Sequence, residues 1–167
     1  MIRIETVENR TQLREFVRFP LRIYSGDSPW VPPIWREEMM RLDRARGPFF
    51  VHSDAALFLA LDAAGEPVGR IAASRFNRHL EVYCDGVGFF GFFECVDDES
   101  VARHLFESAA EWLRGQGLRR MRGPASFTIN EEIGLLIENF DVPPTMLTTW
   151  NPPYYRRLVE SVGLAKA

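Results

Sequence analysis

One carboxylate in the sequence lies among aromatic residues, where it could act in acid–base chemistry. Glu94 stands near the end of the segment Gly86–Cys95, which contains four phenylalanines. Burial among such side chains disfavours a charged carboxylate and raises its pKa toward the range in which a general base works. We therefore expect Glu94 to be a catalytic base. The alternative is a strand-end carboxylate that faces water or pairs with an arginine.

Polar residues near the C-terminus form a second group of candidates. Tyr154 and Tyr155 could donate a proton to a departing group. Tyr155 falls on an apolar helical stripe and is expected in the core, which leaves Tyr154 partly exposed as the candidate acid. Asn151 could orient a substrate or cofactor amide, but helix capping explains it completely and is the stronger interpretation. The polar cluster 130–132 could bind a substrate or cap a helix.

Histidines and cysteines do not indicate a metal site or a redox motif. His52, His79 and His104 are too scattered for metal ligation. Cys84 and Cys95 lack metal-ligand or redox spacing. We expect both to be free buried thiols in a reducing cytoplasm, and a disulfide between them is the alternative.

Composition excludes several classes of protein. The chain has 167 residues, of which 46% are hydrophobic and 13% aromatic, so we expect a single globular domain over 1–167. A net charge of −3 argues against a nucleic-acid partner. The sequence has no run of about 18 apolar residues and no apolar signal region at its start, so we expect a cytoplasmic protein without a membrane partner.

Hydrophobic periodicity predicts the elements that position these residues. Alternation over Ile2–Val7 predicts a strand, and apolar residues at helical spacing predict a helix that Thr11 caps and Pro20 interrupts. The further predicted elements are a short helix at about Ile34–Leu42, a hairpin of Ala55–Asp62 and Val68–Phe76, a buried strand at Gly86–Cys95, a long helix that the segment 97–100 caps and Gly115 or Gly117 ends, strands at Arg120–Ser126 and Thr145–Trp150, and a last helix that Asn151 caps. Residues 130–140 are a short helix or an ordered excursion. This order predicts an α/β (α+β) fold with helices on the faces of one sheet.

The order resembles that of the GNAT superfamily of acyltransferases. The buried strand Gly86–Cys95 leads directly into a capped amphipathic helix, and Asn151 is followed one helix later by Leu158–Leu164, which resembles the GNAT pattern Leu-Tyr-Glu-Lys-x-Gly-Phe. The segments Gly88–Glu94 and Asn151–Tyr155 are similar to those of uncharacterised bacterial GNAT-like proteins. The resemblance implies a mixed, mostly antiparallel central sheet flanked by helices.

The same resemblance implies an acyl-CoA-dependent N-acyltransferase that uses acetyl-CoA or another acyl-CoA. A small-molecule or peptide amine would lose a proton to Glu94 or to water and attack the thioester directly. The residues themselves make Tyr154 the candidate that protonates the thiolate, and packing is the stronger alternative for its ring. The loop Ser28–Pro33 would lie on the acceptor side. The implied cofactor contacts are Phe93, Cys95, Val96, Ser100 and Asn151.

Three departures from the GNAT pattern bear on activity. The glycine-rich turn that cradles the pyrophosphate is replaced by Val96–Ala102, which has three acids and no glycine, although the helix dipole still favours an anion. The position that often holds a general-acid tyrosine falls on Val159. The sequence ends soon after Leu164, before one or two strands that a GNAT domain normally has, so a homodimer that completes the sheet is one expectation.

Two other interpretations remain open. A GNAT-like module without catalytic activity, serving interaction or dimerisation, is favoured by the missing glycine turn and by Val159. An unrelated α/β binding domain could match the element order by chance. That last interpretation predicts no splay between the strand at Gly86–Cys95 and the strand that follows it.

Overall fold

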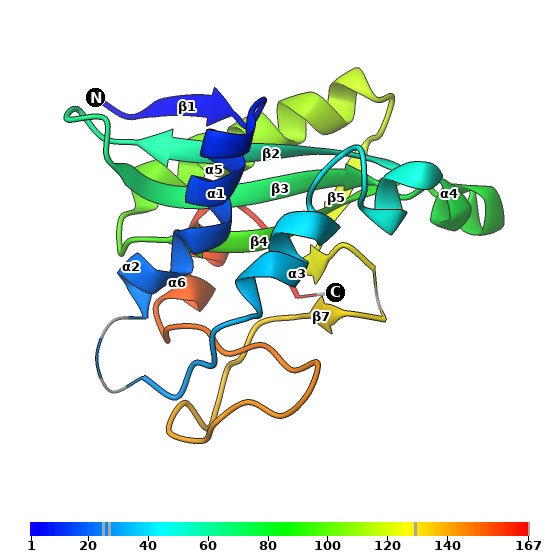
Figure 1. Cartoon of the computed structure of the whole chain (residues 1–167). Coiled ribbons are helices and arrows are strands. Elements are labelled where there is room, and N and C mark those ends of the chain that lie inside the picture. Colours follow the sequence, from blue (N-terminus) through cyan, green and yellow to red (C-terminus); the bar gives the residue numbers. More distant parts are fainter. Residues whose placement is uncertain (25, 27, 129, 167) are drawn as a thin grey trace.

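A five-stranded sheet forms the centre of the computed structural model, which describes residues 1–24, 26, 28–128 and 130–166 (Figure 1). The strands are antiparallel except for the last, which runs parallel to its neighbour. The expected mixed, mostly antiparallel sheet is confirmed. In spatial and chain order the strands are β1 (Arg3–Thr6), β2 (Asp54–Leu61), β3 (Pro67–Arg75), β4 (Val87–Cys95) and β5 (Arg120–Arg122).

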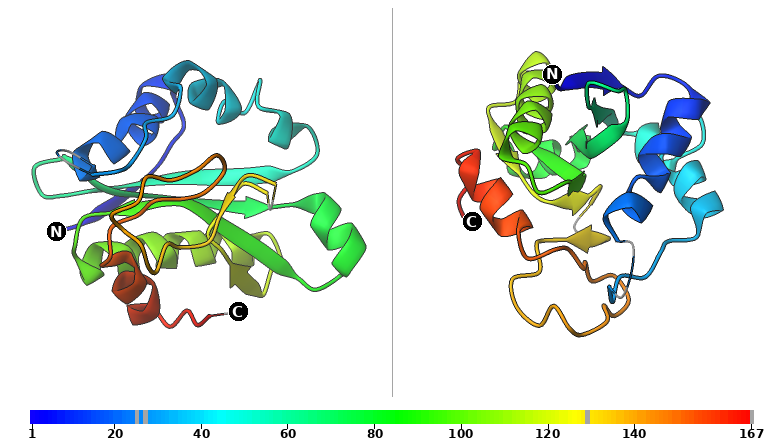
Figure 2. Two further views of the ribbon diagram at one scale, coloured as in Figure 1. Left: turned by 90° about the horizontal axis from the view of Figure 1, so that it is seen from below. Right: turned by 90° about the vertical axis from the view of Figure 1, so that its left-hand side faces the viewer.

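Helices cover both faces of this sheet (Figure 2). The long helix α5 (Glu99–Gly115) packs on one face, and α6 (Tyr155–Ser161) lies beside it. The opposite face is covered by α1 (Arg10–Arg18), α2 (Pro20–Ile23) and α3 (Trp35–Arg41). Two short elements remain, the 3₁₀ helix η1 (Pro48–Val51) and α4 (Asn77–Tyr83). Within the described ranges, no helix combines the length and apolar character that crossing a bilayer requires.

The central strands are apolar on both sides because each side meets a helical layer. In β2, Ala56 and Phe58 pack into the core under α5, whereas Leu57 and Leu59 pack into the core under α1. Successive side chains of a strand point to opposite faces, so a strand buried on both faces has an unbroken apolar sequence. The predicted hairpin and buried central strand are both confirmed by this arrangement.

Two helix predictions need correction. The cap of α1 is Asn9, whose side chain accepts from the backbone N–H of Gln12, so the helix begins earlier than the expected cap Thr11. The helix α4 was not predicted, because none of its seven residues is buried and it therefore carries no apolar stripe.

The chain after β5 also differs from its prediction. The expected strand at Arg120–Ser126 is split into β5 and β6 (Ala125–Ser126), which forms a hairpin with β7 (Glu132–Ile133). Thr145–Trp150 is not a strand, and Thr148 folds back to bond the carbonyl oxygen of Thr145 in a turn. A β-branched sequence forms a strand only where a neighbouring strand can receive it.

The strands β4 and β5 part after a short ladder. Pairing covers Val87–Phe89 with Arg120–Arg122, and the chain then crosses over β4. A Cβ atom on Gly91 would lie 2.0 Å from the carbonyl oxygen of Ala125, so only glycine permits this crossing. The next residue, Phe92, has a φ of 51° and forms a bulge in β4. The interpretation as an unrelated domain, which predicted no splay here, is wrong.

Candidate functional site

A cavity of about 460 Å³ lies where the β6–β7 hairpin passes over the bulge of β4. Its walls come from α2, α3, β3, β4, the hairpin and the segment 144–151, and Glu94 is among the lining residues. A larger open groove of about 1060 Å³, lined by α1, α3 and β2, contains none of the predicted site residues. The smaller cavity is therefore the candidate site.

Glu94 is the centre of a buried junction between four elements. Its Oε2 atom accepts hydrogen bonds from the hydroxyls of Tyr24, at 2.5 Å, and Tyr155, at 2.7 Å, and its Oε1 atom lies 3.6 Å from Nη2 of Arg70. Burial raises the pKa of Glu94, and this outweighs the lowering by Arg70 and the two hydroxyls. The structure thus shows both the expected burial and the arginine partner of the alternative interpretation. The catalytic role of Glu94 stays a prediction.

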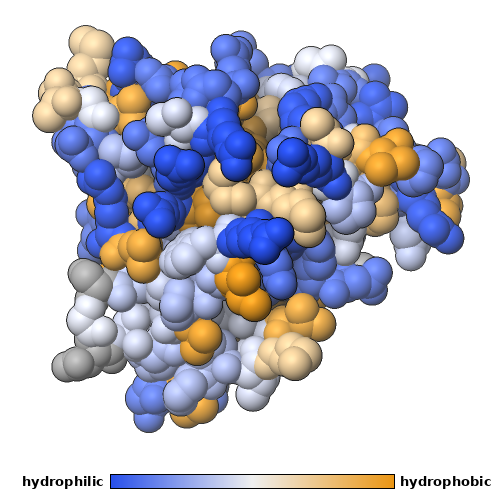
Figure 3. Space-filling model, viewed as in Figure 1, coloured by the Kyte–Doolittle hydropathy of each residue, from blue (hydrophilic) through white to orange (hydrophobic). Residues whose placement is uncertain are grey.

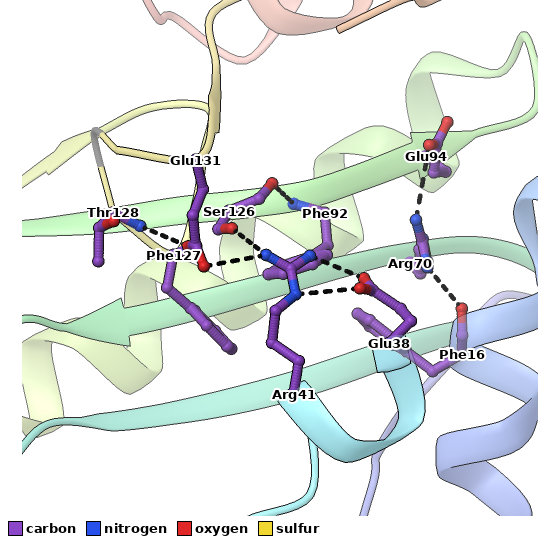
Figure 4. Close-up of polar contacts among 10 residues, drawn as sticks. All are labelled: Phe16, Glu38, Arg41, Arg70, Phe92, Glu94, Ser126, Phe127, Thr128 and Glu131. Carbon is purple, nitrogen blue, oxygen red and sulfur yellow. Dashed lines mark hydrogen bonds and ion pairs between the residues drawn. The ribbon is translucent and has the colours of Figure 1, made fainter. Parts of the chain in front are cut away.

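Arg70 is a charged residue within the otherwise apolar middle of β3. It is only 7% exposed, its Nη1 donates to the carbonyl oxygen of Phe16 at 2.8 Å, and its guanidinium lies over the Phe16 ring (Figure 4). Its Nε atom is buried without a hydrogen-bond partner among the described residues. The cavity wall thus includes a guanidinium with an unused donor.

Arg41 ties α3 to the β6–β7 hairpin. It binds both carboxylate oxygens of Glu38, donates to the carbonyl oxygen of Ser126 at 2.7 Å and lies 3.3 Å from Glu131 (Figure 4). The interaction with Glu38 has the bidentate geometry that gives arginine–carboxylate pairs their specificity. This network holds the hairpin above β4.

Glu132 lies at the mouth of the cavity. It is exposed, and no hydrogen bond or ion pair engages its side chain within the described part of the chain. Partial desolvation raises its pKa and the neighbouring Glu38 adds to this, whereas Arg41 and Arg70 oppose the shift. The sequence pointed to the cluster 130–132 as a substrate-binding excursion or a helix cap, without a role for this carboxylate.

Aromatic rings form one wall of the cavity. Tyr24 stacks on Trp30 with 4.6 Å between ring centroids, and Trp150 meets Tyr24 edge-on at 5.5 Å. The Trp150 indole N–H donates to the carbonyl oxygen of Phe140 at 2.9 Å, which fixes its orientation. Aromatic faces beside carboxylates suit a cation.

The predicted cofactor residues on β4 contact α6. The Cys95 N–H donates to the Tyr155 hydroxyl at 2.9 Å, and the Tyr154 hydroxyl donates to the Cys95 carbonyl oxygen at 2.8 Å. Phe93 is buried, and the Val96 N–H bonds to β3. Burial raises the pKa of Tyr154, so its hydroxyl stays protonated but is a weaker acid than an exposed tyrosine. A pantetheine chain could pair with the backbone of Cys95 only in exchange for these two tyrosine hydrogen bonds.

The acids at the start of α5 are all engaged. Asp98 caps the helix by accepting from the backbone N–H of Ser100, and Asp97 and Glu99 both pair with Arg157 of α6. Three carboxylates would oppose a pyrophosphate at this helix start, and the Arg157 guanidinium reduces that repulsion. The predicted cofactor contact at Ser100 has its backbone donor occupied by the cap.

Asn151 does not cap the last helix, so that interpretation is wrong. It is 4% exposed, its Oδ1 accepts from the Leu136 N–H at 2.8 Å, and its Nδ2 donates to the carbonyl oxygens of Leu136 and Pro152. The residue before α6 is Tyr154, which makes no side-chain cap. Asn151 instead closes the loop 137–150 that precedes the helix. Its predicted contact with a cofactor stays a prediction.

Several residues of the site could not be predicted from the sequence, because they come from segments far apart in the chain. Tyr24 is 70 positions from Glu94, and Arg41 is 85 positions from Ser126. Only Arg70 left a signal, since a charged residue within an apolar strand is rarely buried without a partner.

The cysteines and the potential metal ligands were also compared with their predictions. Cys84 and Cys95 are free, as expected, but only Cys95 is buried. Within the described residues, no group of histidine, cysteine or acidic side chains is arranged to hold a metal ion.

Two solved structures share this architecture. An acetyltransferase of the GNAT family from Staphylococcus aureus matches with a TM-score of 0.52 over 72% of this chain and 71% of its own, at 14% identity. A protein of Pyrococcus furiosus described as an acetyl transferase matches with a TM-score of 0.52 over 100% of this chain and 95% of its own, at 13% identity. This chain has the GNAT fold. At these identities the likeness concerns the GNAT fold alone.

Two curated bacterial proteins are similar in sequence. Protein YghO of Escherichia coli is 37% identical over 163 residues, which are 98% of this chain and 41% of that protein. The bacterial ceramide synthase of Caulobacter vibrioides is 37% identical over 163 residues, which are 96% of this chain and 42% of that protein. The GNAT-fold chain thus spans about two fifths of the length of each relative. No protein-family model matches the sequence.

Proposed function

We propose that this chain is an acyl-CoA-dependent N-acyltransferase whose amine acceptor binds in the cavity beside Glu94. The observation that carries the proposal is the charge of that cavity within a GNAT fold. Among the described residues, four carboxylates lie at or around it and two guanidiniums oppose them, a balance of −2 when all are ionised: Glu38, Glu94, Glu131 and Glu132 against Arg41 and Arg70. Such a site favours a cation, and an amine is protonated at neutral pH.

The name of one relative supports an acceptor with a long apolar chain. That relative is named a bacterial ceramide synthase, and a ceramide is by definition an amide of a long-chain amino alcohol. In this chain, three exposed apolar side chains, Val31, Met146 and Leu147, line the same cavity. Figure 3 shows that the lower part of the molecule carries apolar and weakly polar side chains with few strongly hydrophilic ones. We propose that the ammonium group enters the cavity while the chain lies along this rim.

The edge of β4 is the proposed place for the acyl donor. Beyond Phe89 this edge has lost its partner strand β5, and the tyrosines of α6 bond to Cys95 there. Binding would exchange the hydroxyls of Tyr154 and Tyr155 for amide groups of the donor, so α6 moves as the donor enters. Arg157 already provides a cation at the start of α5, where a pyrophosphate would lie.

The chain supplies three parts of the proposed reaction. A carboxylate of the cavity takes a proton from the ammonium group, and the neutral amine then attacks the thioester carbon. The bulged backbone at Phe92 positions the carbonyl, and most of the rate comes from this placement. As the carbon–sulfur bond breaks, Tyr154 is the candidate donor of a proton to the departing thiolate, and it regains a proton from the attacking nitrogen, which keeps its last proton in the amide.

A second function, an interaction module without catalysis, is favoured by one observation. The tyrosines of α6 already satisfy both backbone groups of Cys95, and the chain lacks the glycine-rich turn at the start of α5. A closed edge of this kind needs no cofactor to complete its hydrogen bonds. The chain would then contribute structure or contacts to a larger assembly.

Direct binding and transfer measurements separate these functions. We would titrate the chain with acetyl-CoA and with palmitoyl-CoA by calorimetry, and follow thiol release with sphinganine or dodecylamine as the acceptor. Micromolar binding, weakened at least tenfold in Arg157→Glu, with thiol release that depends on the amine, supports the acyltransferase. Arg156→Glu is the control, because among the described residues Arg156 pairs only with Glu160 of its own helix. Absence of binding at millimolar donor supports the interaction module instead.

A further inference from the structure

The three carboxylates that line the cavity differ in their partners. Glu38 is held on both oxygens by Arg41. Glu94 accepts two tyrosine hydroxyls on one oxygen and faces Arg70 with the other. Glu132 alone has a side chain that no described residue engages. A carboxylate that is held by several donors gives up those bonds when it takes a proton, whereas an unengaged carboxylate does not.

The backbone places Glu132 close to the bulge of β4. In the β6–β7 hairpin, Glu132 lies directly opposite Ser126. The Ser126 hydroxyl accepts a hydrogen bond from the Phe92 N–H at 3.3 Å, and Arg41 binds the Ser126 carbonyl oxygen. Residues opposite each other in an antiparallel pair are about 5 Å apart between Cα atoms. The hairpin therefore carries Glu132 to the point where β4 bends, and Arg41 fixes it there.

We propose that Glu132 is the general base that deprotonates the amine, and that Glu94 is a positioning residue. This inference rests on the proposed N-acyltransferase function. Glu94 joins the end of α2, α6 and β3 to β4 through Tyr24, Tyr155 and Arg70, and so sets the shape of the cavity. Glu132 stands at the mouth, where the incoming ammonium group passes first.

The proton transfers balance around this carboxylate. The ionised Glu132 takes one proton from the ammonium group, which leaves a neutral amine with its lone pair free. That lone pair forms the bond to the thioester carbon, and the carbon–sulfur bond breaks with its electron pair on sulfur. A second proton from the nitrogen passes to the thiolate and gives the free thiol. Because Glu132 is exposed, it returns its own proton to water.

The surroundings of Glu132 set the pH at which it can act. The charged groups that face it come from α3, β3, β4 and the hairpin itself: Glu38, Arg41, Arg70, Glu94 and Glu131. Partial desolvation and the neighbouring carboxylates raise the pKa of Glu132, and Arg41 and Arg70 hold the rise in check. A base whose pKa is raised toward the working pH accepts a proton from an ammonium group more readily. An ammonium ion in the cavity would lower that pKa again, so the carboxylate is ionised when the acceptor is bound.

The test is the pH dependence of acyl transfer in glutamine variants. We would measure kcat/KM against pH for the unmodified chain, Glu132→Gln, Glu94→Gln and Glu138→Gln, with palmitoyl-CoA and sphinganine as the probes. Glu138 is exposed in the same excursion and serves as the matched control. Glu132→Gln is expected to lose about 10²- to 10⁴-fold in kcat/KM and to lose the rise of the rate on the acid side of the profile. Glu132→Asp should recover part of the rate with that rise restored.

The glutamine variants and the unmodified chain also show which results would contradict the proposal. Glu94→Gln is expected to change KM or stability while it keeps the acid-side rise. If Glu132→Gln keeps the unmodified profile, or if Glu94→Gln loses the acid-side rise instead, Glu132 is not the base. If the unmodified chain transfers no acyl group to any amine, the proposed function fails, and the role of Glu132 fails with it.

Discussion

The Tyr155 hydroxyl joins Glu94 to the backbone of Cys95. It donates to Glu94 Oε2 at 2.7 Å and accepts from the Cys95 N–H at 2.9 Å, so a single buried oxygen satisfies two groups of β4. Burial raises the pKa of Tyr155 well above its ordinary value, with the negative charge of Glu94 as a further cause, and the hydroxyl therefore stays protonated. The helix α6 is docked on the sheet through this atom.

Removal of that hydroxyl should destabilise the fold. Tyr155→Phe leaves the Cys95 N–H unpaired and takes one donor from Glu94, and a buried group left without its partner costs about 1–3 kcal/mol. Tyr154→Phe is the matched control, because its hydroxyl bonds only to the Cys95 carbonyl oxygen and its loss should cost about 0.5–1.5 kcal/mol. Urea unfolding compares the two, and an equal cost for both variants would contradict the bridging role.

The raised pKa of Glu94 predicts a pH dependence of stability. Since the folded-state pKa exceeds that of an exposed glutamate, the folded chain keeps a proton that the unfolded chain has released. The free energy of unfolding contributed by this group is fully present below the ordinary glutamate pKa and falls as pH rises through the raised value. Glu94→Gln should flatten this decline, as unfolding measured across a pH series would show. An unchanged slope in the variant would rule out Glu94 as its source.

Gly91 is expected to tolerate no side chain. A Cβ atom there would overlap the backbone of Ala125, so Gly91→Ala must push the β6–β7 hairpin away from β4 and should cost about 1–3 kcal/mol. Gly115→Ala is the control, because a Cβ at that position meets no atom within 4 Å, and alanine in a helix should stabilise by about 0.5–1 kcal/mol. Thermal unfolding distinguishes the two. Equal stability of the alanine variants would show that the crossing at Gly91 can relax.

Two substitutions at the start of α5 distinguish an effect on stability from an effect on cofactor binding. Asp98→Ala removes a helix cap and should cost about 0.5–2 kcal/mol in urea unfolding. Asp97→Ala removes only one exposed partner of Arg157, and such pairs contribute little to stability. We expect Asp97→Ala to unfold like the unmodified chain and to bind acetyl-CoA more tightly, because Arg157 is then freer to meet a phosphate. Weaker binding by Asp97→Ala would place the pyrophosphate elsewhere.

Most of the fold could be predicted because its strands and long helix have regular apolar patterns. The hairpin of β2 and β3 and the buried strand β4 follow from apolar runs, and the stripe of α5 follows from a period of 3.6 residues. The segment Thr145–Trp150 misled the prediction, since β-branched residues favour a strand only where a partner strand exists. Gly91 was visible as a glycine, but the backbone that crosses it was not.

The candidate site was predictable only in part. The burial of Glu94 follows from its phenylalanine neighbours, which are local in sequence. The partners that hold it, Tyr24, Arg70 and Tyr155, come from three other elements, and no sequence spacing relates them. Glu132 reaches the cavity through a short hairpin and the crossing over β4, which depend on tertiary contacts rather than on a local pattern.

Asn151 closes the loop 137–150 before α6 in a way that allows the length and sequence of the loop to vary. Its hydrogen bonds to both backbone groups of Leu136 bring together two points 15 residues apart, so residues 137–150 begin and end at one place. The entropy of closing such a loop rises slowly with its length, by about 0.6 kcal/mol for each doubling. Related chains could therefore lengthen, shorten or replace this loop, and with it the rim that an acceptor meets, while the carboxylates and arginines below keep their positions. Under the proposed function, substrate range would then evolve separately from the residues that carry out transfer.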